Sequence, residues 1–431
     1  MNLFEIHTHL YGCLDEDDLN WLGSRKPPRW EIYKNSYYKL YKTYPNIEFL
    51  YQNQIFQTPK LNENQKNILR SFYVFDSSKP KNFLHFQLCF DFIIALSHTD
   101  PEELKEIALR VFHKQKEYYS EYRMMFSPKA SVKEFKEKTL ALIEGFKEAN
   151  KNTTKISKLI ISLNREYPNY EWQYQILKEI QQEFPNDILV GIDFAGCEEN
   201  DSPINKLDFI ETAKKDQQFV ILYHVGEILG NKTPASAVRW ILWAHQMGVH
   251  RIGHAVALAY DEAKVSNQRY IEYTKERLDH LLYLEQLYEI ENQWIPIDYV
   301  KQEIKRATNN QHDTIEIFYS EKELKLYLDF LNFCIEKLKN SAIIESCPTS
   351  NMAISGFSPL PFFEKHQFRV CLGADDPGIF NTSLEKEFQI AKNMVQNSSY
   401  IEQIKKNNQA FCSMNLLKMI QNKKSIDSEI L

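Results

Sequence analysis

The sequence predicts a (β/α)8 TIM barrel, because short apolar runs alternate with amphipathic helical stretches along most of its 431 residues. Several apolar runs are continuous, such as FVILYH at 219–224 and ILVGIDF at 188–194. Continuous apolar runs are typical of parallel strands that are buried on both faces. The chain is longer than a minimal barrel and suits one barrel with insertions.

The same pattern gives the expected position of each element. Eight strands are expected at 3–7, 122–126, 158–163, 188–194, 219–224, 251–254, 342–346 and 369–374. Helices are expected between them, for example at 101–118 and 236–247. A helical stretch from Ser383 onward should close the barrel.

Two helix-rich segments, at about 16–80 and 258–340, do not fit the repeat. We interpret them as helical insertions within a single domain that spans 1–431. The first follows strand one and the second follows strand six, so both should leave the barrel at the end that carries active sites. Their aromatic residues suit either a lid or the subunit contact of a homo-oligomer.

Net charge and cysteine content indicate which partners and which cellular compartment to expect. The formal net charge is -6, which argues against a nucleic-acid or membrane partner. The seven cysteines are scattered and contain no CxxC pair, so reduced thiols and a cytoplasmic location are expected. A cleaved signal peptide is not expected either, because it would remove the first candidate ligand, His7.

Three histidines and one aspartate fall at the expected C-terminal ends of strands. His7 and His9 share one face of strand one, His224 ends strand five, and Asp375 follows strand eight. Each has an ordinary explanation alone, since HxH pairs arise by chance and adjacent carboxylates often cap a helix. Together, at the end of the barrel that carries active sites, they suit one Zn²⁺ with a position left for water.

Three further side chains lie at the same strand ends, and one of them, Glu227, is well placed to shuttle a proton beside such an ion. Glu227 lies three residues beyond His224, His254 ends the RIGH strand, and Asp376 follows Asp375. Zinc lowers the pKa of a bound water to about 7. The combined set therefore predicts a metal-dependent hydrolase.

Six runs of the sequence, taken in order, resemble the motif set of the adenosine deaminase family. They are HTHLYG, GIDFAGCE, YHVGE, RIGHAV, ESCPTSN and CLGADDPGIF. The resemblance covers the barrel from Leu3 to about Gln396 and leaves the two insertions unexplained. It implies a small-molecule purine substrate, adenosine or a derivative, whose 6-amino group is replaced by hydroxyl with release of ammonia.

The resemblance also implies roles for individual residues. One zinc ion per chain would be held by His7, His9, His224 and Asp375. Glu227 would donate a proton to purine N1, and His254 would orient the attacking water and stabilise developing charge. Asp376 would contact the attacking hydroxyl and hold N7, and the backbone of Gly196 would contact N3.

One position departs from the family pattern. The first motif usually reads HxHLDG, or carries Glu in adenine-specific relatives, whereas this chain has Tyr11. In the nucleoside enzymes that Asp binds the ribose 5′-hydroxyl, and a tyrosine cannot accept a hydrogen bond as a carboxylate does. Tyr11 is therefore expected beside the pocket as a substrate-binding residue that disfavours plain adenosine. The alternative is that Tyr11 packs against an insertion.

Two rival interpretations remain open at the level of the sequence. A binuclear amidohydrolase would need a bridging Lys or Glu at the end of strand four, where this chain has Asp193 and Gly196. A catalytically inactive homologue that binds a purine or acts as a scaffold would keep the barrel without turnover. The other zinc deaminase signature, HxE with PCxxC, does not occur in the sequence.

Overall fold

The structure is a computed structural model that describes residues 2–429, apart from 77–78, 81, 200 and 292–293. Eight parallel strands form one sheet in the order β1-β2-β3-β4-β5-β6-β9-β10. Their bounds are β1 (Phe4–His9), β2 (Tyr119–Met125), β3 (Ile156–Asn164), β4 (Leu189–Ala195), β5 (Val220–Val225), β6 (Arg251–His254), β9 (Ile343–Ser346) and β10 (Arg369–Leu372). The predicted (β/α)8 barrel is confirmed.

The barrel closes between its first and last strands through a short parallel bridge. Thr8 pairs with Asp375, where the His9 amide donates to the Asp375 carbonyl over 2.8 Å. The Asp375 amide in turn donates to the carbonyl of His7 over 2.9 Å. This bridge fixes the two strand ends that carry three of the candidate ligands.

Strands β2 and β3 begin earlier than the sequence pattern predicted, at Tyr119 and Ile156. The reason is that buried polar residues, such as Glu121 of β2 and Ser157 of β3, interrupt the apolar run. Glu121 and Arg123 of β2 are both buried, with exposed fractions of 0% and 1%. They form ion pairs inside the barrel and do not mark the end of a strand.

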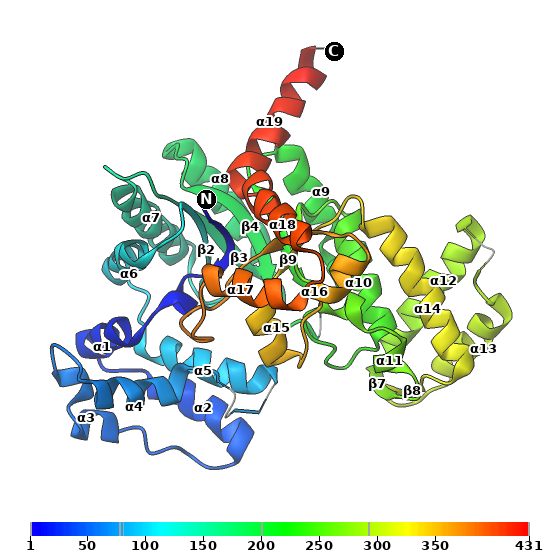
Figure 1. The fold of residues 1–431 in the computed structure, drawn as a ribbon, viewed down its shortest axis with the longest axis horizontal. Helices are drawn as coiled ribbons and strands as arrows, with labels where there is room; N and C mark the ends of the chain where they lie inside the picture. Colours follow the sequence, from blue (N-terminus) through cyan, green and yellow to red (C-terminus); the bar gives the residue numbers. More distant parts are fainter. Residues whose placement is uncertain (1, 77–78, 81, 200, 292–293, 430–431) are drawn as a thin grey trace.

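A ring of helices surrounds the barrel, as Figure 1 shows. The helices outside the two insertions are α5 (Phe83–Leu96), α6 (Pro101–Lys114), α7 (Val132–Ala149), α8 (Tyr170–Glu183), α9 (Leu207–Asp216), α10 (Pro234–Gln246), α15 (Pro348–Ile354), α16 (Leu360–Lys365), α17 (Leu384–Met394), α18 (Ser398–Ala410) and α19 (Ser413–Glu429). Short 3-10 turns lie at Tyr11–Cys13, Ile55–Gln57, Pro203–Lys206 and Val256–Ala259. Helix α6 shows why these elements form: Asp100 caps its first turn and Pro101 begins it.

The C-terminal helices close the N-terminal end of the barrel, opposite the candidate site. Asn408 of α18 donates to the carbonyls of Phe4 (2.8 Å) and Leu372 (2.7 Å), and accepts from the Leu372 amide (2.9 Å). Cys412 and Leu416 pack with apolar side chains from the N-terminal halves of the strands. Helix α19 then projects away from the barrel, as Figure 1 shows.

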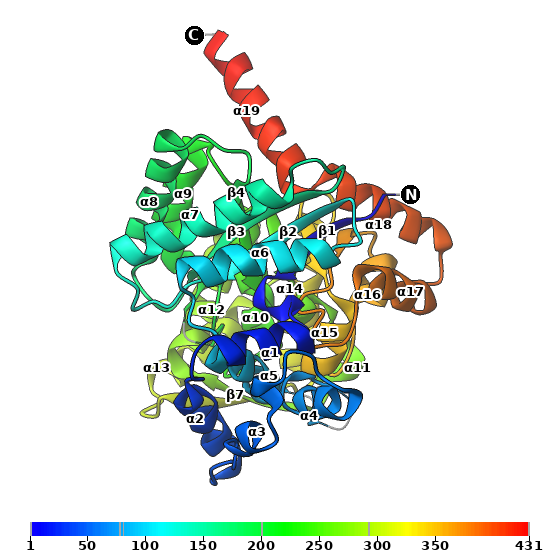
Figure 2. The same cartoon turned by 90° about the vertical axis from the view of Figure 1, so that its left-hand side faces the viewer.

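The segment after β1 is helical, as expected. It contains α1 (Glu16–Arg25), α2 (Trp30–Tyr41), α3 (Phe49–Gln52) and α4 (Glu63–Tyr73). Helix α2 packs against α5 through Tyr33 and Phe92, whose ring centroids are 5.6 Å apart. In both Figure 1 and Figure 2, α1–α5 lie at the end of the molecule opposite α19. This is the end of the barrel that carries the C-terminal ends of the strands.

The segment between β6 and β9 is not wholly helical, which corrects the prediction. It contains α11 (Glu262–Val265), β7 (Arg269–Tyr273), α12 (Thr274–Glu291), α13 (Ile297–Thr308), β8 (Thr314–Phe318) and α14 (Glu321–Leu338). β7 and β8 form a separate antiparallel pair. Each strand is only five residues long, and the partners are far apart in sequence, so the surrounding helical pattern concealed them. Within the described residues, no helix is sufficiently long and apolar to cross a membrane.

Candidate active site

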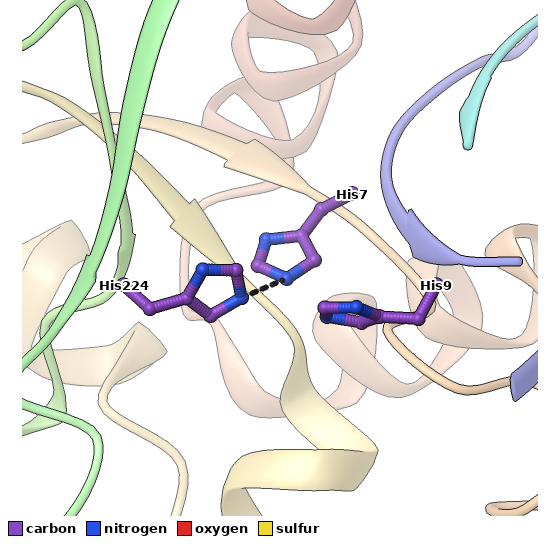
Figure 3. A group of neighbouring side chains, drawn as sticks. All are labelled: His7, His9 and His224. Atoms are coloured by element: carbon purple, nitrogen blue, oxygen red, sulfur yellow. Dashed lines mark hydrogen bonds between the residues drawn. The ribbon is translucent and has the colours of Figure 1, made fainter. Parts of the chain in front are cut away.

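Three histidine rings converge at the C-terminal end of the barrel, as Figure 3 shows. His7 and His9 come from β1 and His224 from β5. The Nε2 atoms of His7 and His224 lie 3.1 Å apart, and the Oδ1 atom of Asp375 lies 3.2 Å from Nε2 of His9. The same oxygen lies 3.6 Å from Nε2 of His7. The structure therefore brings together all four predicted ligand residues.

A second layer of carboxylates fixes the direction in which two of these rings point. Nδ1 of His7 lies 2.8 Å from Oε2 of Glu345, and Nδ1 of His224 lies 3.0 Å from Oδ1 of Asp193. Burial raises the pKa of Glu345, but Arg123 and other cations outweigh it and hold this pKa well below its usual range. An ionised carboxylate only accepts hydrogen bonds, so the ring protons belong on Nδ1.

The positions of the histidine nitrogens indicate whether a metal ion fits between them. With protons on both Nδ1 atoms, the Nε2 atoms of His7 and His224 present lone pairs to each other across 3.1 Å. Two facing lone pairs repel unless a cation lies between them. Burial lowers the pKa of His224 to about 4, so its ring is neutral, the form that ligates a metal. Three imidazole nitrogens and one carboxylate oxygen are a donor set that suits zinc.

An ion-pair network below the histidines was not identified from the sequence. Arg123 donates to Oε2 of Glu345 over 2.6 Å, and Nε of Arg251 lies 2.7 Å from Oε1 of the same carboxylate. Arg251 also donates to Glu121 over 2.5 Å, and Arg123 lies 3.5 Å from Asp193. The available signal was the presence of charged residues inside otherwise apolar strands. The network holds the two carboxylates that orient the histidines.

The carboxyl group of Glu227 lies near the candidate ligands and lines the same cavity. Burial, together with the negative charges of Asp375 and Glu198, raises the pKa of Glu227 well above its ordinary value. A carboxyl group with a raised pKa keeps its proton near neutral pH and is able to donate it.

Glu198 holds the backbone of the loop that carries Glu227. Its Oε1 accepts from the Gly226 amide over 2.7 Å, and its Oε2 accepts from the Glu227 amide over 3.1 Å. The side chain is 4% exposed. Sequence analysis did not single it out, although it belongs to the GIDFAGCE run.

The hydrogen bonds of His254 define its tautomer. The Oδ1 atom of Asn351 accepts from the Cys347 amide over 3.3 Å, so the amide nitrogen of Asn351 faces Nδ1 of His254, 3.1 Å away. Nδ1 must then accept, and the ring proton lies on Nε2, which is 3.7 Å from Oε1 of Glu227. His254 has a φ of 65°, a left-handed backbone conformation that is uncommon for residues other than glycine.

Asp376 is buried against the first motif of the chain. Burial and the neighbouring Asp375 raise the pKa of Asp376 well above its ordinary value. A Cβ atom on Gly12 would lie 1.8 Å from Oδ1 of Asp376, so only glycine fits there. Gly196 has a φ of 101° and lines the cavity, where its backbone is accessible to a ligand.

Tyr11 lies elsewhere than expected. Its hydroxyl donates to Glu103 over 3.0 Å and accepts from Ser97 over 2.7 Å, and the side chain is only 2% exposed. It does not line the cavity at the candidate metal site. The prediction assumed that side chains alternate along an extended strand, so that Tyr11 would point the same way as His9. The backbone is already helical at Leu10, so the Tyr11 side chain points in a different direction from that of His9.

Comparison with solved structures places the fold among known barrels. An N6-mAMP deaminase from Arabidopsis is 16% identical, with a TM-score of 0.56 and coverage of 98% of each chain. An adenine deaminase from Arthrobacter aurescens is 14% identical, with a TM-score of 0.56 and coverage of 99% of this chain and 100% of that one. A zinc-bound amidohydrolase from Burkholderia ambifaria is 11% identical, with a TM-score of 0.55 and coverage of 99% and 93%.

The family assignment rests on a sequence model. The family model described as adenosine deaminase matches residues 53–286 and 333–427, well over half of the chain. The chain belongs to the adenosine deaminase family. The unmatched stretch between the two ranges contains α13 and β8. A search of curated proteins found no match.

Proposed function

We propose that this protein is a zinc-dependent hydrolytic deaminase that converts the 6-amino group of an adenine-type purine to a 6-oxo group and releases ammonia. The observation that carries the proposal is the facing pair of Nε2 lone pairs at His7 and His224, with Asp375 beside them. The proposed ligands are His7, His9, His224 and Asp375. When bound, one zinc ion would activate a water molecule and polarise the reacting centre.

The remaining side chains supply proton transfer and orientation. Glu227, held protonated, donates to purine N1 as water adds to C6. His254 presents its Nε2 proton to the attacking oxygen. Asp376, also held protonated, donates a hydrogen bond to N7, and the backbone of Gly196 contacts N3. As the C6–N bond breaks, one proton of the water leaves on ammonia and the other restores Glu227.

Ammonia release from the zinc-loaded protein tests this proposal. Adenosine, deoxyadenosine, adenine, AMP and N6-methyl-AMP cover the main adenine compounds, and N6-methyl-AMP is followed by methylamine. We expect turnover of at least one compound by the wild-type protein and none by His224→Ala. A protein that binds these purines with normal affinity but turns over none of them would be the inactive homologue.

A further inference from the structure

The cavity at the candidate site has one aromatic wall, formed by a single face of α5. Phe83, Phe86 and Phe90 line the cavity together with Gln87, at the spacing of one helix face. These four side chains are half-buried. Leu84, the neighbour of Phe83, is 61% exposed and is not part of the cavity lining. The wall is therefore a property of one face of the helix.

The rest of the lining combines apolar and carboxyl side chains with the site histidines, Asn164 and one arginine. Met125 and Ile228 add apolar surface. The carboxyl side chains of the lining are Glu166, Glu198, Glu227, Asp375 and Asp376, of which Glu227 and Asp376 have raised pKa values. Among the residues that the structure describes, the lining includes no lysine and a single arginine, Arg165.

Arg165 lines the cavity but is almost entirely buried. Its side chain is 2% exposed, it donates to the carbonyl of Phe194 over 3.3 Å, and its guanidinium lies 5.3 Å from the ring centre of Tyr223. A phosphate group beside the α5 wall would therefore meet aromatic side chains and no well-exposed lysine or arginine among the described lining residues. Burial of an unpaired anion is strongly unfavourable.

The expected orientation of a purine brings its substituent to the α5 wall. With C6 at the histidine cluster and N7 at Asp376, N9 lies at the far side of the base and points towards the mouth of the barrel. Helix α5 lies at that end of the molecule, as Figure 2 shows. The cavity volume is about 370 Å³, near the lower end of the range for small-molecule sites.

We propose that the face of α5 formed by Phe83, Phe86 and Phe90 is a subsite for an uncharged, apolar group attached through N9. The substrate class is then a neutral adenine nucleoside with an apolar 5′ substituent, not a nucleotide. This inference rests on the proposed deaminase function. The Arabidopsis ADAL structures, in contrast, hold the nucleotides GMP and IMP.

Binding of 6-oxo products tests the subsite without turnover. Calorimetry of the zinc-loaded protein with 5′-methylthioinosine, inosine and IMP compares one base with three 5′ groups. We expect 5′-methylthioinosine to bind roughly three- to tenfold more tightly than inosine, because an additional apolar group is buried. IMP should bind the weakest of the three. The kcat/KM values of the corresponding 6-amino compounds should follow the same order.

Two arginine variants test whether the preference for an apolar 5′ group arises from one face of α5. Phe83→Arg should reduce the preference for the methylthio compound over the nucleotide at least tenfold, because it adds a cation to the wall. Leu84→Arg adds the same charge on the adjacent, outward-facing position and should leave the preference unchanged. Phe83→Leu checks that an apolar replacement retains the wild-type order.

The possible outcomes separate the subsite from the reaction. Tighter binding of IMP than of 5′-methylthioinosine, or equal effects of the two arginine variants, would overturn the subsite even if ammonia is released. The predicted order of product binding without ammonia release from any 6-amino compound would support the subsite and refute the deaminase proposal.

Discussion

At the scale of single residues, the proposed proton donor Glu227 depends on a second carboxylate, Glu198. Glu198 holds the backbone of Glu227 through the amides of Gly226 and Glu227. The negative charge of Glu198 also contributes to the raised pKa of Glu227. The sequence places both residues in recognisable motifs, but only the structure shows that one supports the other.

Glu227→Gln should lower kcat by about 10²–10⁴-fold, the usual contribution of a general acid. The metal content should not change, because Glu227 is not among the proposed ligands. In the wild-type protein the donor must be protonated, so activity should be lost as pH rises through the elevated pKa of Glu227. A pH–rate profile of kcat together with elemental analysis of the variant checks both points. Near-full activity in Glu227→Gln would show that the donor is another group.

Glu198→Gln should lower kcat by roughly 10- to 100-fold, the usual effect of losing a residue that holds a functional group in position. The amide cannot accept from all the backbone N–H groups that the carboxylate serves, so the position of Glu227 becomes less defined. KM should change little, and the alkaline limb of the pH profile should move to lower pH. Glu199→Gln, one residue along the chain, is the matched control and should resemble the wild type. A merely structural role would lower thermal stability and leave the pH profile in place.

At the scale of elements, the strands that carry the site were predictable and the small sheet was not. Strand β6 was predicted with its observed bounds, because the RIGH run and its position after a helix are unambiguous. The β7–β8 pair was missed, because short strands that pair across many intervening residues leave no local signal. The four candidate ligands were predictable from their places at strand ends. The position of Tyr11 was not predictable, because a turn directly after β1 ends the alternation of side-chain directions along the strand.

The carboxylate of Glu345 ties its own strand, β9, to three other strands of the barrel. It pairs with Arg123 of β2 and Arg251 of β6, and it lies 2.8 Å from His7 of β1. Glu345→Gln should lower the free energy of unfolding by about 3–5 kcal/mol, because it leaves buried guanidinium groups without their counter-charge. Glu336→Gln on the surface of α14 should change it by less than about 0.5 kcal/mol. Denaturant titration of both metal-free variants measures the difference, and equal stabilities would contradict the role of the network.

At the scale of the whole molecule, the barrel is closed from both ends by segments outside the strand–helix repeat. The segment after β1 supplies helices at the catalytic end, and α18 and α19 cover the opposite end. Asn408 joins β1 to β10 at the seam where the barrel closes. This seam also holds Asp375 beside His9. Stability of the seam and geometry of the site are therefore linked.

Asn408→Ala should destabilise the protein by roughly 2–4 kcal/mol, since three buried backbone groups lose their partner. The neighbouring Gln409 is exposed, and Gln409→Ala should have little effect. Thermal unfolding with and without zinc measures the change. If the seam supports the site, the zinc affinity of Asn408→Ala should also fall. An unchanged zinc affinity would show that the geometry of the site does not depend on the seam.

The most direct test of the central claim is a titration of the metal-free protein with zinc while ammonia release from the best adenine compound is measured. The four-ligand site predicts activity that rises in proportion to added zinc and stops rising at one ion per chain. His224→Ala should show no such break. Activity without added metal, a break at two ions per chain, or no activity at any zinc concentration would contradict the account.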